Sequence, residues 1–170
     1  MVAYSFKRRF VTPIRLGLGL LMQDPKGNWL RTSCVIEPGA LVGVPFDPEK
    51  HLDPSARPKR QTIRAIGKRR HARPGETVQL YYGMRTKQCE KIGEGRCIAA
   101  LPIRIVVKEH SMPTWIGGAF VGAGSAEYPG GLHELAQRDG FEGSGDMHEF
   151  WKAEHGLGEF NGVLIKWAPL

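Results

Sequence analysis

"RPKRQTIRAIGKRRHARPGETVQLYYG", residues 57–83, runs from a cluster of cations through a turn into a strand pattern. Its last part alternates, with Val78, Leu80 and Tyr82 on one face, as expected of a strand with one buried side. The Arg-Pro-Gly-Glu sequence before this alternation predicts a turn, because Pro and Gly favour tight reversals. The stretch therefore predicts a core strand at 76–83 whose entry is fixed by the turn.

The rest of the chain predicts short strands, a few short helices and many loops, in keeping with its 22 glycines and 12 prolines. Further strand patterns lie at 2–6, 28–36, 40–44, 95–110 and 160–167. No repeated strand–helix–strand period is present. We therefore expect one α+β domain over residues 1–170, built on a small mixed or antiparallel β-barrel with short flanking helices.

Helical spacing is found in three places, at residues 10–18, 132–141 and 144–156. Gly140 is expected to end the second helix in the left-handed conformation, and Gly156 the third. Either Ser144 or Asp146 is expected to cap the third helix at its N-terminus.

The positive charge of the chain is local. The formal net charge is +7, from 24 basic and 17 acidic residues, and eight of the basic residues lie between Arg57 and Arg73. Without these eight, 16 basic residues stand against 17 acidic ones, so the rest of the chain is close to neutral. One positive face on a neutral body favours a polyanionic partner through phosphate contacts and counterion release.

Cysteine usage and hydropathy predict a cytoplasmic protein without membrane association. The three cysteines are Cys34, Cys89 and Cys97, an odd number that argues against a disulfide framework. The N-terminus lacks the apolar core of a signal peptide, and no apolar run approaches the length of a membrane span.

Lys59 and Thr62 are a candidate catalytic pair. In an extended segment they lie on opposite faces, whereas a turn or coil allows them to meet. A lysine whose pKa is lowered by burial and neighbouring cations can take the proton of a hydroxyl nucleophile. The same segment also suits phosphate binding, because Arg60 and Arg64 offer forked donors.

Several ordered blocks resemble the ASCH-domain family of PUA-like barrels. They are "YSFKRRFVTPI" at 4–14, "KRQTIRA" at 59–65, "RHARPGETVQLYYGMRTKQC" at 70–89, "ELAQRDGF" at 134–141, "EFWKAEHG" at 149–156 and "FNGVLIKW" at 160–167. The resemblance implies a PUA-like barrel with a cleft that binds RNA or other nucleic acid. One bacterial branch of the family hydrolyses the amide of N4-acetylcytidine with a threonine nucleophile, a lysine and a carboxylate.

By this resemblance Lys59 and Thr62 match the first two catalytic positions. The carboxylate is expected in the helix after the strands, where this chain has Asp139 and the amidase branch has Glu. Glu134 is the alternative carboxylate. Arg64 is expected to line the cleft and hold a phosphate or a carbonyl oxyanion.

Family members reach the Lys-x-x-Thr block soon after the first helix, so residues 18–58 resemble an insertion. This segment is expected either to cap the cleft or to decorate the edge of the barrel. Trp29 within it is a candidate for base stacking or for ordinary packing.

The expected partner is RNA, DNA or a modified nucleoside. The candidate binding residues are Arg60, Arg64, Lys68, Arg69, Arg70, Arg73, Tyr82 and Arg85, with Tyr81 and Lys87 in the same aromatic and basic cluster. Two alternatives to the amidohydrolase remain open at this point, a non-catalytic nucleic-acid-binding module and a single-strand ribonuclease.

No cofactor or metal is predicted. Cys89 and Cys97 bracket an expected hairpin, "CEKIGEGRC", without a Cys-x-x-Cys motif, so zinc would need distant ligands such as His71 or His148. His155 is expected to be a cation at a helix C-terminus rather than a catalytic base.

Overall fold

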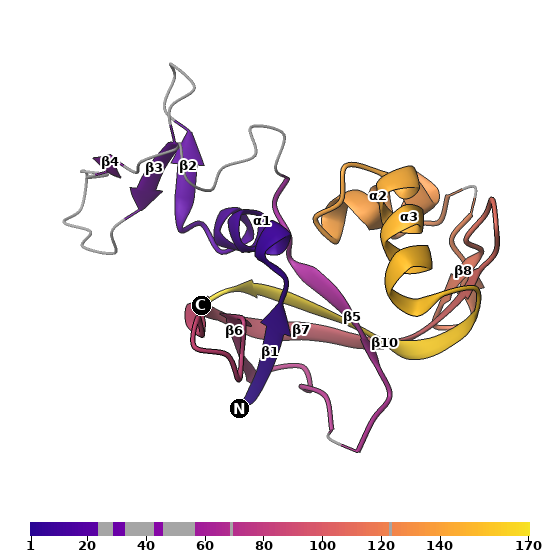
Figure 1. The fold of residues 1–170 in the computed structure, drawn as a ribbon, viewed down its shortest axis with the longest axis horizontal. Helices are drawn as coiled ribbons and strands as arrows, with labels where there is room; N and C mark the ends of the chain where they lie inside the picture. Colours follow the sequence, from indigo (N-terminus) through magenta and orange to yellow (C-terminus); the bar gives the residue numbers. More distant parts are fainter. Residues whose placement is uncertain (24–28, 33–42, 46–56, 69, 123) are drawn as a thin grey trace.

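The computed structural model describes residues 1–23, 29–32, 43–45, 57–68, 70–122 and 124–170. It confirms a mixed α+β protein, with a seven-stranded sheet and a few short helices (Figure 1). The sheet is mixed because one pair, β1 with β6, is parallel and the others are antiparallel.

The main sheet follows the order β1-β6-β7-β10-β5. Its strands are β1 (Val2–Phe6), β6 (Thr77–Tyr82), β7 (Glu90–Val107), β10 (Gly158–Pro169) and β5 (Gln61–Ala65). The short strands β8 (Thr114–Ile116) and β9 (Ala119–Phe120) extend it beside β7. Among the described residues β1 and β5 end this path without pairing with each other, so the sheet is not closed into a barrel by backbone hydrogen bonds.

The strand pattern at 76–83 is confirmed, since Val78 and Leu80 of β6 are fully buried and Tyr82 is half-buried. The hairpin expected between Cys89 and Cys97 is wrong. Residues 90–107 form one continuous strand, and the reversal lies earlier, between Tyr82 and its partner Glu90. Cys89 is exposed and Cys97 is buried, and neither forms a disulfide.

The glycines of β7 that suggested a turn are explained by close packing. A Cβ at Gly93 would lie 2.6 Å from a methyl carbon of Leu18, and one at Gly95 would lie 2.8 Å from the carbonyl oxygen of Ala168. These positions need glycine because other groups approach the strand there.

Four short helical segments are described. They are η1 (Arg8–Phe10), α1 (Val11–Gly17), α2 (Gly131–Arg138) and α3 (Ser144–His155). Figure 1 shows the segment that leads into β5 passing between α1 and α2. Two backbone hydrogen bonds fix it there, from Lys59 N to the Pro13 oxygen (2.8 Å) and from Arg60 N to the Arg138 oxygen (3.4 Å).

The expected helix ends are confirmed and the expected cap is not. Gly140 (φ +84°) and Gly156 (φ +73°) both adopt the left-handed conformation after their helices. Gly143, rather than Ser144 or Asp146, is the N-cap of α3, and it makes no side-chain capping bond. The Asp146 carboxylate instead accepts a hydrogen bond from the Glu142 backbone and pairs with Arg9 at 2.6 Å.

Part of the predicted insertion at 18–58 forms a separate small sheet. It contains β2 (Leu21–Gln23), β3 (Trp29–Thr32) and β4 (Gly43–Pro45), which pair only with one another among the described strands. In Figure 1 this sheet projects beside α1, away from α2 and α3. Residues 24–28, 33–42 and 46–56 of the segment lie outside what the structure describes, and so do Cys34 and the side chain of Trp29.

Within the described residues, no helix has both the length and the apolar character needed to cross a membrane.

Candidate active site

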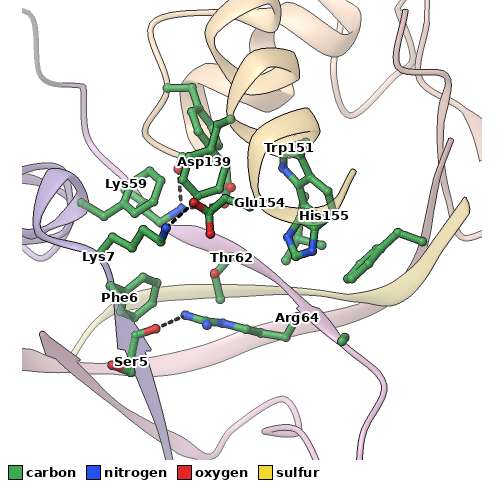
Figure 2. Close-up of a pocket in the computed structure, with 16 residues that line it drawn as sticks. Ser5, Phe6, Lys7, Lys59, Thr62, Arg64, Asp139, Trp151, Glu154 and His155 are labelled. Atoms are coloured by element: carbon green, nitrogen blue, oxygen red, sulfur yellow. Dashed lines mark hydrogen bonds and ion pairs between the residues drawn. The ribbon is translucent and has the colours of Figure 1, made fainter. Parts of the chain in front are cut away.

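A cavity of about 350 Å³ lies between the β1 and β5 edges of the sheet and helix α3 (Figure 2). It is called here the Thr62 cavity. Its polar lining residues are Ser5, Lys7, Lys59, Thr62, Arg64, Asp139, Glu154 and His155. Its apolar lining residues are Phe6, Phe10, Ile63, Ala65, Phe141, Phe150, Trp151 and Phe160. Lys59 and Thr62, three residues apart in the sequence, therefore lie in the same cavity as the distant Asp139.

Lys59 and Asp139 form a buried ion pair. The Lys59 amine donates to Asp139 Oδ1 at 2.7 Å and also to the main-chain carbonyl oxygen of Asp139. Only 1% of Lys59 and 5% of Asp139 is exposed. A charged pair this deep is kept only when its hydrogen bonds are satisfied, so its position is a specific feature of the fold.

Two glycines allow the backbone and side chain of Lys59 to lie so deep. A Cβ at Gly17 would come within 2.1 Å of the Lys59 carbonyl oxygen. At Gly140, whose φ is +84°, a Cβ would lie 3.0 Å from Lys59 Cδ. Helix α1 and the turn after α2 thus hold Lys59 from two sides, and any side chain at Gly17 would displace it.

Burial shifts both members of the pair toward their neutral forms. The pKa of Lys59 is lowered to about 8, mainly by desolvation, while the neighbouring Asp139 carboxylate partly offsets that effect. Desolvation likewise raises the pKa of Asp139, and Lys59 opposes that shift. Aromatic rings complete the surroundings, with the Lys59 amine 4.7 Å from the centroid of Phe10 and 5.9 Å from that of Phe6. The site thus holds an amine that can exchange a proton near neutral pH.

Thr62 lies on β5, three residues after Lys59, and is 5% exposed. Strand β5 begins at Gln61, so Lys59 lies in the irregular segment before it. Of the two arrangements considered from the sequence, the structure has the coil, not the fully extended segment. Both residues therefore reach one cavity. Figure 2 shows the Thr62 hydroxyl pointing toward the side of the cavity where Lys59, Asp139 and Glu154 converge.

Arg64 crosses the gap between the two sheet edges. Its Nη2 donates to the Ser5 carbonyl of β1 at 2.7 Å, and its guanidinium lies 4.6 Å from the Phe6 ring centroid and 5.5 Å from that of Tyr4. Its Nε is buried without a hydrogen-bond partner. Arg64 therefore connects β5 to β1 and also lines the Thr62 cavity.

Lys7, Glu154 and His155 line the cavity but were not predicted as site residues. Lys7 and Glu154 form an ion pair at the mouth, between the end of β1 and the last turn of α3 (Figure 2). His155 lies in the last turn of α3, with its ring centroid 4.4 Å from that of Trp151, and burial lowers its pKa. The only sequence signal was the "EHG" ending of a helix, which is common.

Glu134, the alternative carboxylate, lies outside the cavity. It pairs with Arg138 and accepts a hydrogen bond from Gly130 N at 2.9 Å. Of the two carboxylates considered, the structure brings Asp139 to Lys59.

The predicted binding residues divide into several groups. Arg60 faces away from the Thr62 cavity and donates to the Gly17 carbonyl at 2.8 Å. Arg70 is held by Glu76 through bonds of 2.7 and 2.8 Å. Arg73 and Lys68 are exposed, and Arg69 lies outside the described residues.

The aromatic and basic residues of the β6–β7 turn also lie apart from the Thr62 cavity. The Tyr82 hydroxyl donates to Gln88 at 3.1 Å, and the Arg8 guanidinium lies 5.6 Å from the centroid of its ring. Arg85 is exposed and has a positive φ of 70°. Tyr81 pairs with Lys91 across the strands, and its hydroxyl donates to Gln79 at 3.3 Å.

Among the described residues, no group of three or more His, Cys, Asp or Glu side chains is placed to hold a metal ion.

Comparison with protein-family models, with curated proteins and with solved structures gives no match in any of the three.

Proposed function

We propose that this protein is an amidohydrolase of the ASCH type that removes an acyl group from the exocyclic nitrogen of cytosine. The observation that carries the proposal is the buried Lys59–Asp139 pair in the same cavity as the Thr62 hydroxyl. A hydroxyl nucleophile needs a base, and a base works best when its pKa is near the working pH. The pKa of about 8 for Lys59 meets that requirement.

In the proposed reaction the neutral Lys59 amine takes the Thr62 proton as the hydroxyl oxygen attacks the acyl carbon. The guanidinium of Arg64, which lines the same cavity, supplies a donor for the oxyanion. The C–N bond then breaks, and Lys59 returns the proton to the leaving amine of cytosine. Water, deprotonated by Lys59, then attacks the acyl-threonine ester, and Lys59 returns this proton to the Thr62 oxygen as the carboxylic acid leaves. Asp139 orients the lysine throughout.

The shape and lining of the cavity suit this substrate. A volume of about 350 Å³ lies at the small end of the range for ligand pockets, which fits a nucleoside-sized molecule. Phe6, Phe141, Phe150 and Trp151 offer apolar and aromatic walls against which a planar base can pack. These walls support a heteroaromatic amide over a peptide.

The shorter carboxylate of this chain is compatible with the proposal. The amidase branch that the sequence resembles has Glu where this chain has Asp139. Here Lys59 reaches both the Asp139 carboxylate and the carbonyl of the same residue, so the amine is held from two sides. The backbone contact compensates for the shorter side chain.

The architecture is also consistent with a PUA-like barrel in which β1 and β5 lie next to each other without backbone hydrogen bonds between them. The Arg64 side chain of β5 spans the gap between these two strands and donates to the Ser5 carbonyl of β1. We include this fold in the proposal because Arg64 both bridges the two edge strands and lines the Thr62 cavity.

The direct test is to incubate the protein with N4-acetylcytidine and to follow the release of cytidine and acetate by chromatography. We expect multiple turnovers at pH 8. The amidohydrolase would be refuted if, between pH 6 and pH 9, the protein releases no more than one cytidine per molecule. It would also be refuted if release does not exceed the enzyme-free rate. Tight binding of the nucleoside without turnover would instead favour a recognition module, for which the exposed cations of the 57–73 segment are the supporting observation.

The pH profile gives a second prediction. Lys59 acts as a base only when neutral, and its pKa is lowered to about 8 by burial. We therefore expect kcat/KM to rise about tenfold per pH unit below pH 7 and to level off above about pH 8, because kcat/KM reports ionisation of the free enzyme. A profile that is flat from pH 6 to pH 9 would contradict the role of Lys59 as the base.

A further inference from the structure

A second cavity, of about 670 Å³, lies on the other side of Arg64. It is called here the Lys68 cavity. It is lined by Met1, Val2, Ala3, Tyr4, Arg64, Ala65, Gly67, Lys68, Arg70, His71 and Met84. Two of these residues, Arg64 and Ala65, also line the Thr62 cavity. The two cavities are therefore neighbours that share one arginine.

The charge of the Lys68 cavity is positive and only partly compensated. None of its lining residues is acidic. Glu76 neutralises Arg70 through two hydrogen bonds, and these hold the pKa of Glu76 at about 2. Lys68 is exposed and makes no ion pair with any residue that the structure describes. Lys68 and Arg64 thus provide the free positive charge.

The spacing of residues along β1 indicates how far apart the linings of the two cavities lie. Tyr4 borders the Lys68 cavity and Phe6 borders the Thr62 cavity, and both belong to β1. Residues two apart on a strand are separated by about 7 Å. A group attached to the sugar of a nucleoside in the Thr62 cavity can reach across Arg64 at this separation.

We propose that the Lys68 cavity binds the phosphate of a nucleotide whose acylated base lies in the Thr62 cavity. The inference rests on the proposed function and extends it, because it makes a phosphorylated nucleotide, rather than the free nucleoside, the preferred substrate. Lys68 supplies a point charge to the phosphate, and Arg64 joins the two subsites.

The experiment compares kcat/KM for N4-acetylcytidine, for its 5′- and 3′-monophosphates and for a single-stranded hexanucleotide containing one N4-acetylcytidine. We expect at least one phosphorylated substrate to exceed the nucleoside by about ten- to hundredfold, as one charge-assisted contact provides. The advantage should shrink between 20 and 300 mM salt. A preference for a monophosphate identifies a free nucleotide, and a preference for the hexanucleotide alone identifies a strand.

Lys68→Gln should remove most of this advantage and leave kcat/KM for the nucleoside unchanged. Lys108→Gln, an equal charge change at an exposed residue after the far end of β7, should preserve the advantage. Equal rates for nucleoside and all phosphorylated forms, or an equal loss on both in Lys68→Gln, would overturn the phosphate subsite.

A binding experiment separates this inference from the proposed function. Cytidine and cytidine 5′- and 3′-monophosphates are titrated by calorimetry into the wild-type protein and into Lys68→Gln. Tighter binding of a monophosphate that depends on Lys68 supports the subsite even if no acyl group is ever hydrolysed. Equal affinity for cytidine and both monophosphates overturns it even if the amidohydrolase is active.

Discussion

Thr62→Val is expected to abolish hydrolysis of N4-acetylcytidine, with a loss on the order of 10⁴- to 10⁶-fold in kcat, as when a nucleophile is removed from a catalytic set. Valine keeps the shape of threonine and lacks the hydroxyl oxygen that we propose as the nucleophile. The Thr62 side chain is 5% exposed, so a larger change would disturb packing as well as chemistry. The measurement is the rate of cytidine release under saturating substrate.

Thr62→Ser is the matched variant, because it restores the hydroxyl and removes only a methyl group. We expect it to keep measurable turnover, whereas Thr62→Val should still bind cytidine and unfold at nearly the wild-type temperature. The Thr62 hydroxyl forms no hydrogen bond with another described side chain, so its loss leaves no buried partner unsatisfied. Full activity in Thr62→Val would show that the nucleophile is another group, such as water.

The second large effect concerns stability. Lys59→Met should destabilise the fold by about 3–5 kcal/mol near pH 7, since it leaves the buried Asp139 carboxylate without its partner. Lys59→Met combined with Asp139→Leu should recover most of this loss, because no charge then remains buried. Urea unfolding of both single variants, the double variant and the wild type gives the coupling energy directly.

The pH dependence of this loss has a definite sign. In Lys59→Met the pKa of Asp139 is still raised by burial and is no longer opposed by the lysine. The folded state then binds a proton that the unfolded state releases above about pH 4, so the stability of the variant falls as pH rises from there. The difference from wild type should therefore be largest at neutral pH and shrink toward pH 4.

Lys7→Met is the matched control for Lys59→Met. It also breaks a lysine–carboxylate pair, the one with Glu154, but the Lys7 and Glu154 side chains are 55% and 38% exposed. Water solvates the carboxylate that remains, so we expect little change in stability. Equal losses of stability in Lys7→Met and Lys59→Met would contradict the importance of burial at the Lys59–Asp139 pair.

Local patterns predicted most of the secondary structure. Alternation identified β1, β6 and β10, and glycines marked the ends of α2 and α3. The prediction of a hairpin at 89–97 was wrong, because the glycines that suggested a turn lie inside a continuous strand. The glycine signal is ambiguous because both a turn and the close approach of Leu18 to Gly93 require the absence of a Cβ.

The candidate site could be predicted only in part from the sequence, because local patterns do not show which distant residues meet in the fold. Lys59 and Thr62 lie three residues apart, so their chemistry can be considered together, but Asp139 is 80 residues away from Lys59. Only the family resemblance connected it to them. Lys7 and Glu154 carry no local signal at all, since each is an ordinary exposed residue type until the fold places β1 against the last turn of α3.

The two glycines around Lys59 have a consequence for finding relatives of this protein. A Lys-x-x-Thr sequence is common, and many chains that contain it have nothing to do with this chemistry. The lysine can reach its buried position only if the residue matching Gly17 lacks a side chain and a glycine directly follows the carboxylate, as Gly140 follows Asp139. In any homologue that keeps the buried ion pair, we therefore expect the two glycines, the lysine and the acidic residue to be inherited as a set. When the lysine is lost, selection on both glycines should relax at the same time.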